Sequence, residues 1–303
     1  MELLRTVQRL LPASRRPAAP AGWELIPAGR LSRAGRADVL NAAYVNYYVP
    51  MRLNADQMAA MEQSYDIDLG RSAAAVIGRE SVGMALLGRR GDRAWLGSVG
   101  VIPAWRRRGL ARALVGRVIA AAGEAGARRI TLEVIAENMP ARTLYDALGF
   151  RPVGELLTWR RRADADPLPI HEERLAHARP RDLLAHFAAW HDQPACWQSE
   201  EATLRNQIHR LAGYRLDLDG APAAYALVSG SDDAVWLMDV GINPAFGPVR
   251  AGRPLLQALA NAYFGKTMTM MNVPADAGLC RVLAALRFLV TVRQWEMELR
   301  MAD

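Results

Sequence analysis

The stretch GSVGVIPAWRRRGLARALVGRVI, residues 97–119, runs from an apolar strand pattern through an arginine-rich turn into a helix pattern. Leu110, Leu114 and Val118 recur at helical spacing after the turn. A helix N-terminus carries unpaired N–H groups and the positive end of the helix dipole, so it can bind anions. Gly109 has no Cβ and would let a phosphate approach the backbone. The stretch therefore predicts a phosphate-binding turn between a strand and a helix.

Two other interpretations of the arginines are possible. A solvated charged loop explains the charge, but it does not explain the small residues Gly109 and Ala111 beside it. Nucleic-acid binding needs basic residues spread over a face, with aromatic side chains for stacking. Here the arginines are compressed at one helix start, and elsewhere they alternate with acids. We therefore expect no nucleic-acid partner.

The composition indicates a soluble protein of two domains. The chain has 303 residues, 51% hydrophobic and 23% charged, which is long for one hydrophobic core. Its net charge of +7 comes almost entirely from arginine, since Lys266 is the only lysine. No apolar run is long enough to span a bilayer, and Glu2 makes the N-terminus a poor signal peptide. Cys196 and Cys280 lack metal-ligand spacing, so we expect a cytoplasmic protein with free thiols and no membrane contact.

The first half predicts the order β-α-α-β-β-β-α-β-α-β. Apolar alternation predicts the strands and helical spacing predicts the helices, with Asn54 as an N-cap and Gly149 as a C-cap. The expected strands are 23–28, 72–81, 81–90, 93–102, 129–136 and one from 151, and the expected helices are 36–48, 54–65, 110–123 and 139–148.

The second half repeats this pattern. The segment AWLGSVGVIPAWRRRGLARAL matches VWLMDVGINPAFGPVRAGRPLL, with Trp95 falling on Trp236. At that offset Arg106 meets Gly247 and Gly109 meets Arg250, so the turn is broken in the second copy. Such internal similarity indicates two copies of one fold. We expect an extension over residues 1–22, a first domain over 23–163, a Pro- and charge-rich connector, and a second domain over 170–303.

At this point the chain resembles the GNAT superfamily of acyl-CoA-dependent N-acyltransferases. RRRGLA, Arg106–Ala111, matches the family's R/Q-x-x-G-x-G/A motif, and ENMPARTLYDALGF, Glu137–Phe150, resembles its second motif. The two motifs cover roughly residues 95–155. The resemblance implies an α/β (α+β) fold: a tandem-repeat bacterial member with two GNAT-like domains, each a mixed, mostly antiparallel twisted sheet flanked by helices. We expect the second domain to be degenerate, because its turn lacks the motif.

The resemblance also implies acetyl-CoA, or another acyl-CoA, as co-substrate. Its pyrophosphate would lie on the turn, and its pantetheine arm would pair with the fourth strand. Tyr145 would protonate the leaving thiolate, although a buried aromatic role is also consistent with its position. Asn138 would cap its helix and could meet the pantetheine arm. The implied cofactor-binding residues are Val99, Gly100, Val101, Arg106, Arg107, Arg108, Gly109, Leu110, Ala111, Arg112, Asn138 and Tyr145.

The general base is not obvious from the sequence. Many relatives carry a glutamate on the fourth strand, but AWLGSVGV, residues 94–101, has no carboxylate. Glu80 and Glu133 are the candidate bases, although alternation along its strand also fits Glu133 facing solvent, and water alone could serve. A non-catalytic acyl-CoA-binding, sensing or interaction protein is therefore the alternative to an N-acetyltransferase.

The acceptor, metal content and assembly are less constrained. The acceptor would be a small-molecule or peptide amine, and the protein a monomer or homodimer. The first two helices would shape the acceptor site, although most of their aromatic and methionine side chains fit a core equally well. The five histidines lack metal-ligand spacing, so we expect surface histidines and no metal. The aromatic and methionine residues in question are Tyr44, Tyr47, Tyr48, Met51, Met58, Met61 and Tyr65.

Overall fold

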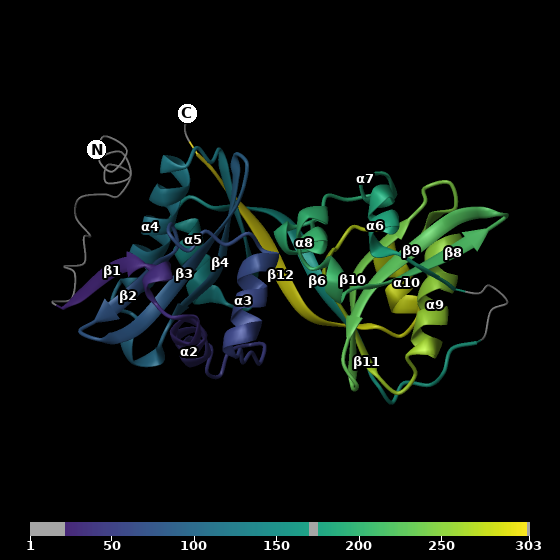
Figure 1. The fold of residues 1–303 in the computed structure, drawn as a ribbon, viewed down its shortest axis with the longest axis horizontal. Coiled ribbons are helices and arrows are strands. Elements are labelled where there is room, and N and C mark those ends of the chain that lie inside the picture. Colours follow the sequence, from purple (N-terminus) through teal and green to yellow (C-terminus); the bar gives the residue numbers. More distant parts are fainter. Residues whose placement is uncertain (1–21, 170–174, 302–303) are drawn as a thin grey trace. The chain divides into compact units, whose positions relative to one another are not determined.

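The computed structural model describes residues 22–169 and 175–301. Most of the expected N-terminal extension lies outside these residues. Two compact units are present: unit 1 comprises the chain up to Val153 together with the residues from Met297 on, and unit 2 comprises Gly154–Glu296. Figure 1 shows both units, with helices and strands of each labelled. The connector expected near residues 163–169 thus lies inside unit 2, because β6 (Arg151–Arg161) already belongs to it from Gly154 on.

Unit 1 contains a sheet in the order β1-β2-β3-β4-β5, antiparallel up to β4 and parallel between β4 and β5. The end of the chain lies beside β5, since the N–H of Met301 donates to the carbonyl of Arg128. The strands are β1 (Trp23–Pro27), β2 (Ala73–Ile77), β3 (Glu80–Arg90), β4 (Arg93–Val101) and β5 (Arg129–Ile135), and the helices are α2 (Arg33–Ala43), α3 (Ala55–Ser64), α4 (Leu110–Glu124) and α5 (Met139–Asp146).

Helices α2 and α4 cover opposite faces of this sheet. Gly100 of β4 is paired with Met84 of β3, so both residues face the same side, and a Cβ at Gly100 would meet Ala43 of α2. The neighbouring Gly83 faces the other side, where a Cβ would meet Leu114 of α4. The glycines thus allow both helices to approach the sheet closely.

Helix boundaries follow local capping. Asn54 caps the start of α3 as predicted, and the structure adds Gln57, whose side chain completes a reciprocal capping box. Helix α2 begins at Arg33 rather than near residue 36, because the Ser32 hydroxyl accepts the N–H of Gly35. It ends at Ala43, earlier than expected, which leaves Tyr44–Tyr48 outside the helix.

Unit 2 contains the sheet order β12-β6-β11-β10-β9-β8-β7, with β10 and β11 parallel. A core of apolar side chains from β9, β10, β11, α9 and α10 fills this unit. The strands are β7 (Ala176–Ala178), β8 (Ala212–Leu218), β9 (Ala221–Gly230), β10 (Ala234–Ile242), β11 (Thr267–Pro274) and β12 (Leu289–Arg300), and the helices are α6 (Pro180–Leu183), α7 (Phe187–Trp190), α8 (Glu201–Asn206), α9 (Arg253–Ala262) and α10 (Leu279–Ala285).

The repeat expected from the sequence is visible in the strand register. In unit 1 the parallel ladder ends at Trp95, opposite Thr131. In unit 2 it ends at Trp236, opposite Thr269. The two tryptophans that align in the sequence thus occupy the same position in the two sheets, and the predicted fold class is confirmed.

Candidate functional site

The site in unit 1 is a gap between two parallel strands. The β4–β5 ladder comprises three residue pairs and ends at Trp95, while β4 continues to Val101 and β5 to Ile135. A bulge lies in the part of β4 that is no longer paired with β5. There Ser98 has a φ of 41° and the register with β3 shifts. Bulges increase local twist. The strands therefore separate beyond Trp95 and leave an edge of β4 open.

The open edge of β4 presents hydrogen-bond donors. The N–H of Ile102 donates to Val82 on the β3 side, so alternation turns the N–H and C=O groups of Val99 and Val101 toward the gap. The Val99 carbonyl accepts the Tyr44 hydroxyl at 3.2 Å, and the Val101 carbonyl accepts Nε of Arg106 at 3.0 Å. Because both carbonyls already accept hydrogen bonds, the N–H groups of Val99 and Val101 are the groups of this edge that can bind a ligand.

The turn before α4 forms a second set of donors. The first hydrogen bond of α4 runs from the N–H of Ala113 to the carbonyl of Gly109, so the preceding N–H groups lie at the free helix end. Arg107 and Gly109 are left-handed, with φ of 64° and 85°. Such alternation directs successive N–H groups into one concavity that suits an anion. The turn therefore has a backbone conformation that can present N–H groups to an anion, and phosphate binding stays a prediction.

The arginines of the turn divide into different roles. The Arg106 guanidinium donates to the carbonyls of Val101 and Ala43, so it fastens the end of α2 to β4. Arg108 lies over the Trp105 ring at 4.6 Å. In the described part of the chain, no side-chain hydrogen bond or ion pair engages Arg107 or Arg112. These last two guanidiniums are available to a bound anion.

Tyr145 lies on α5 and is 7% exposed, with its ring edge against Phe150. Burial, with a smaller contribution from Tyr47, raises the pKa of Tyr145 well above its usual value. Its hydroxyl therefore stays protonated at neutral pH. Asn138 caps α5 by accepting the N–H of Ala141, and its side-chain amide donates to the Tyr47 hydroxyl at 3.3 Å.

The two candidate bases lie in different surroundings. Oε2 of Glu133 accepts the indole N–H of Trp95 at 2.8 Å, so this carboxylate lies where the strands separate. Its side chain is half-buried rather than turned fully to solvent. Glu80 begins β3 at the turn from β2 and is exposed.

A cluster of tyrosines lies beside the gap. Tyr47 packs edge-on against Tyr44 and Tyr48, with ring centroids 4.6 and 5.3 Å apart. The Tyr48 hydroxyl donates to the carbonyl of Glu137, which follows β5. The segment after α2 therefore contacts residues at the ends of both separated strands. Met58, in contrast, is fully buried in the core.

Two contacts here escaped the sequence analysis. The Tyr44 and Arg106 hydrogen bonds to the β4 carbonyls join residues that are not neighbours in one element. The motif pointed to Arg106 as a phosphate ligand. No local pattern distinguishes a guanidinium that binds a ligand from one that binds a backbone carbonyl.

Unit 2 has the same strand separation but a different turn. Pro248–Gly252 is a π-helix that runs directly into α9, so the residues that form an open turn in unit 1 are wound into helix here. Arg250 pairs with Asp219 and lies over Phe246. When LYDALGF, residues 144–150, is aligned with VLAALRF, residues 282–288, Tyr145 falls on Leu283, which is fully buried. Neither the open turn nor the phenol of unit 1 is present.

The sequence predicts surface histidines, but His191 is not one. Its ring nitrogens form hydrogen bonds with Asp239 and with the carbonyl of Phe187, because the sheet brings together residues that are far apart in the sequence. Over the described ranges, no group of three or more His, Cys, Asp or Glu side chains could hold a metal ion. No helix among these residues has the length and apolarity to cross a bilayer.

Comparison with known proteins identifies the fold. Residues 41–150 match the model of the Acetyltransferase (GNAT) family. A GCN5-related N-acetyltransferase from Sphaerobacter thermophilus is similar in structure, with a TM-score of 0.70, 15% identity, and coverage of 94% of this chain and 98% of that one. No curated protein sequence matches the chain at a significant level.

Two further structures are similar over nearly the whole chain. One is a tandem GNAT protein from the clavulanic acid biosynthesis pathway, with a TM-score of 0.65, 16% identity, and coverage of 93% and 100%. The other is a putative acetyltransferase from Pyrococcus horikoshii, with a TM-score of 0.62, 16% identity, and coverage of 96% and 94%. At these identities the likeness concerns the fold.

Proposed function

Because residues 41–150 form a domain of the GNAT acetyltransferase family, we propose that unit 1 transfers an acetyl group from acetyl-CoA to a primary amine by direct attack. The observation that carries the proposal is the separation of β4 from β5 beside a turn of free N–H groups. One feature suits an extended amide arm and the other suits a phosphate. The acceptor is a small-molecule or peptide amine.

Acetyl-CoA would bind by two sets of N–H groups. The turn over residues 107–112 would hold the pyrophosphate, with Arg107 and Arg112 adding charge. The N–H groups of Val99 and Val101 would face the pantetheine arm and the thioester carbonyl. Tyr44 and Arg106 support this by occupying the neighbouring carbonyls, which would otherwise repel a carbonyl oxygen.

The reaction needs a stabilised oxyanion and two proton transfers. The amine nitrogen attacks the thioester carbon, and the oxygen gains negative charge opposite the β4 N–H donors. The C–S bond then breaks, and the thiolate takes the proton of the Tyr145 hydroxyl. The acceptor nitrogen must lose a proton. We assign this step to Glu133, which lies where the strands separate, ahead of the exposed Glu80.

The proposed phosphate-binding turn can be tested by titration calorimetry. Acetyl-CoA is titrated into the wild-type protein and into the Gly109→Glu and Gly126→Glu variants. Both glycines are left-handed and flank α4, so both variants carry similar backbone strain. Only Gly109→Glu places a carboxylate in the turn. We expect one-to-one binding that is lost in Gly109→Glu and kept in Gly126→Glu.

Thiol release from acetyl-CoA with a panel of primary amines then tests transfer. Turnover with one of the amines supports the enzyme. Binding without turnover for any amine supports the alternative, a non-catalytic acyl-CoA sensor, which the absence of a carboxylate on β4 favours. Loss of binding in both variants, or in neither, contradicts the assignment of the turn.

A further inference from the structure

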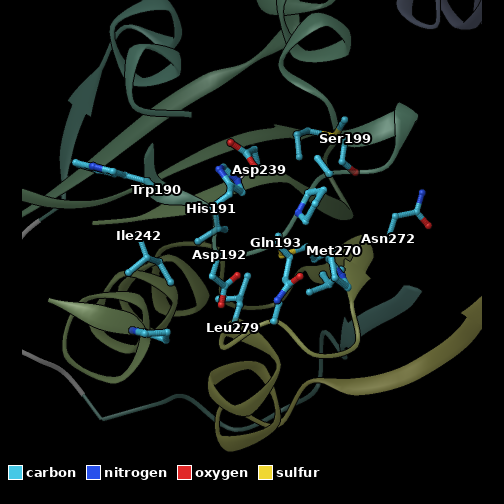
Figure 2. Close-up of a pocket in the computed structure, with 18 of the residues that line it drawn as sticks. Trp190, His191, Asp192, Gln193, Ser199, Asp239, Ile242, Met270, Asn272 and Leu279 are labelled. Carbon is cyan, nitrogen blue, oxygen red and sulfur yellow. Dashed lines mark hydrogen bonds and ion pairs between the residues drawn. The ribbon is translucent and has the colours of Figure 1, made fainter. Parts of the chain in front are cut away.

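Unit 2 contains a cavity that the proposed reaction does not use. It has a volume of about 310 Å³ and lies between the separated parts of β10 and β11. Figure 2 shows side chains of residues 190–199, β10 and β11 around it. Methionine, proline and aliphatic side chains provide most of the lining, including Met238, Val240, Met270, Pro274 and Leu279. A cavity of this size with a mainly apolar lining and a few polar groups is typical of a small-molecule site.

The cavity is unsuited to an anion. Among the described residues that line it there is neither arginine nor lysine, although the whole chain has 38 of them. The residues that correspond to the proposed anion-binding turn of unit 1 are wound into the π-helix here. The rim adds Asp192, whose carboxylate accepts the N–H of Gly278. A phosphate or carboxylate ligand would therefore meet no positive partner except His191.

His191 is already committed to a neighbour. Its Nε2 lies 2.8 Å from Asp239, and its Nδ1 lies 2.7 Å from the carbonyl of Phe187. Asp239 also accepts the hydroxyl of Tyr225 at 2.7 Å. Figure 2 shows His191 and Asp239 side by side at the cavity. The pair satisfies its own charges, so the remaining charged side chain among the described lining residues is Asp192 at the rim, which accepts the N–H of Gly278.

The lining also includes the uncharged polar side chains of Gln193, Ser199 and Asn272, and the backbone of β10 adds further polar groups. The N–H of Asn243 donates to Ala223 on the β9 side, so alternation turns the N–H and C=O groups of Val240 and Ile242 toward β11, where the ladder has ended. A strand edge offers a donor and an acceptor at alternate residues. An extended secondary amide matches both.

We propose that this cavity binds an uncharged, extended secondary amide with a small apolar group. The amide would pair with the backbone of Val240 and Ile242, and the apolar group would lie against Met238, Met270 and Leu279. A blocked peptide and an N-acylated small amine share this chemistry. The site is independent of acetyl transfer in unit 1.

The test uses ligand-observed NMR on the full chain with N-acetylleucine N-methylamide as the probe. Leucine N-methylamide and N-acetylleucine, its cationic and anionic analogues, measure the charge preference, and N-isobutylacetamide distinguishes a simple N-acyl amine from a peptide. We expect both neutral amides to bind, and the one with the higher affinity indicates whether the ligand is a blocked peptide or an N-acylated small amine. Each charged analogue should bind at least about tenfold more weakly. No binding of either neutral amide, or equal binding of the charged analogues, overturns the proposal.

Two variants and one matched control locate the binding. Ala195→Trp fills the cavity, and Ala189→Trp adds the same ring at an exposed position of α7 outside the lining. Val240→Pro removes a donor that faces away from β9, so the sheet keeps its ladder. We expect probe binding to weaken at least about tenfold in Ala195→Trp and Val240→Pro but not in Ala189→Trp. Unchanged binding in a folded Ala195→Trp or Val240→Pro protein overturns the assignment. The Gly109→Glu variant should bind the probe like the wild type, so a failure of the acetyltransferase proposal leaves this result standing.

Discussion

At the scale of single residues, the Tyr145 hydroxyl is a buried phenol whose pKa is raised above its usual value by burial and by Tyr47. We predict that Tyr145→Phe lowers kcat by about a hundredfold, because it removes the proton donor and keeps the ring contact with Phe150. The affinity for acetyl-CoA, measured by calorimetry, should stay within about twofold. Since a raised pKa keeps the phenol protonated, the wild-type kcat should not fall through Tyr145 ionisation below pH 10. Equal losses of kcat and of affinity would contradict the acid role.

His191 gives a pH-dependent contribution to stability. Burial alone would lower its pKa, but the hydrogen bond and charge of Asp239 raise it above the ordinary value near 6.5. A raised pKa means that the contribution is complete below pH 6.5 and is lost as the pH rises through the folded-state pKa. We predict that His191→Gln lowers the stability of unit 2 by about 2 kcal/mol at pH 6 and by less at pH 9. Urea unfolding of both proteins at a series of pH values measures the difference, and a constant difference would exclude the ion pair.

At the scale of elements, the contact of α2 with β4 depends on Gly100. A Cβ at this position would lie 2.7 Å from the Cβ of Ala43, too close for two carbon atoms. We predict that Gly100→Ala destabilises unit 1 by about 1–3 kcal/mol through overpacking. Gly116→Ala in α4 is the matched control, because a Cβ there meets no atom within 4 Å and should stabilise the helix by about 0.5–1 kcal/mol. Thermal unfolding of both variants tests the opposite signs.

The same scale separates what the sequence predicts from what it does not. Elements with their own local signal appear as expected, for example α3 with its capping box and α4 after left-handed Gly109. Contacts between elements do not carry such a signal. The hydrogen bond from Arg106 to Ala43 and the ion pair of His191 with Asp239 join residues 63 and 48 positions apart, and only the assembled sheet brings them together.

At the scale of the whole molecule, the internal repeat explains why the sheets of the two units are alike. It does not explain which residues belong to each unit. Trp95 and Trp236 mark equal positions, as the internal alignment predicts. The residues from Met297 on, however, belong to unit 1 rather than to the second copy. Half-buried and exposed residues alternate along the first half of β12, as in other strands. Such alternation predicts a strand, but it does not predict which strand lies next to it. The partner of the last strand was therefore not predictable.

This division has a measurable consequence. The end of the chain contacts unit 1 through the N–H of Met301 on the carbonyl of Arg128, the ion pair of Glu298 with Arg129, and Leu299 beside Gly149. We predict that removing residues 297–303 exposes the edge of β5 and weakens acetyl-CoA binding at least about tenfold, because β5 bounds the gap beside β4.

Hydrogen exchange followed by mass spectrometry checks this prediction in each unit separately. Amides of β5 should exchange faster in the truncated protein, because they lose a neighbouring strand, while those of β9 in unit 2 should keep their protection. Arg300→Ala is the control, since its exposed side chain pairs with Glu298 but leaves the backbone of the last strand in place. Equal loss of protection in both units would mean that the last residues stabilise the chain as a whole, and unchanged β5 exchange would mean that they do not support unit 1.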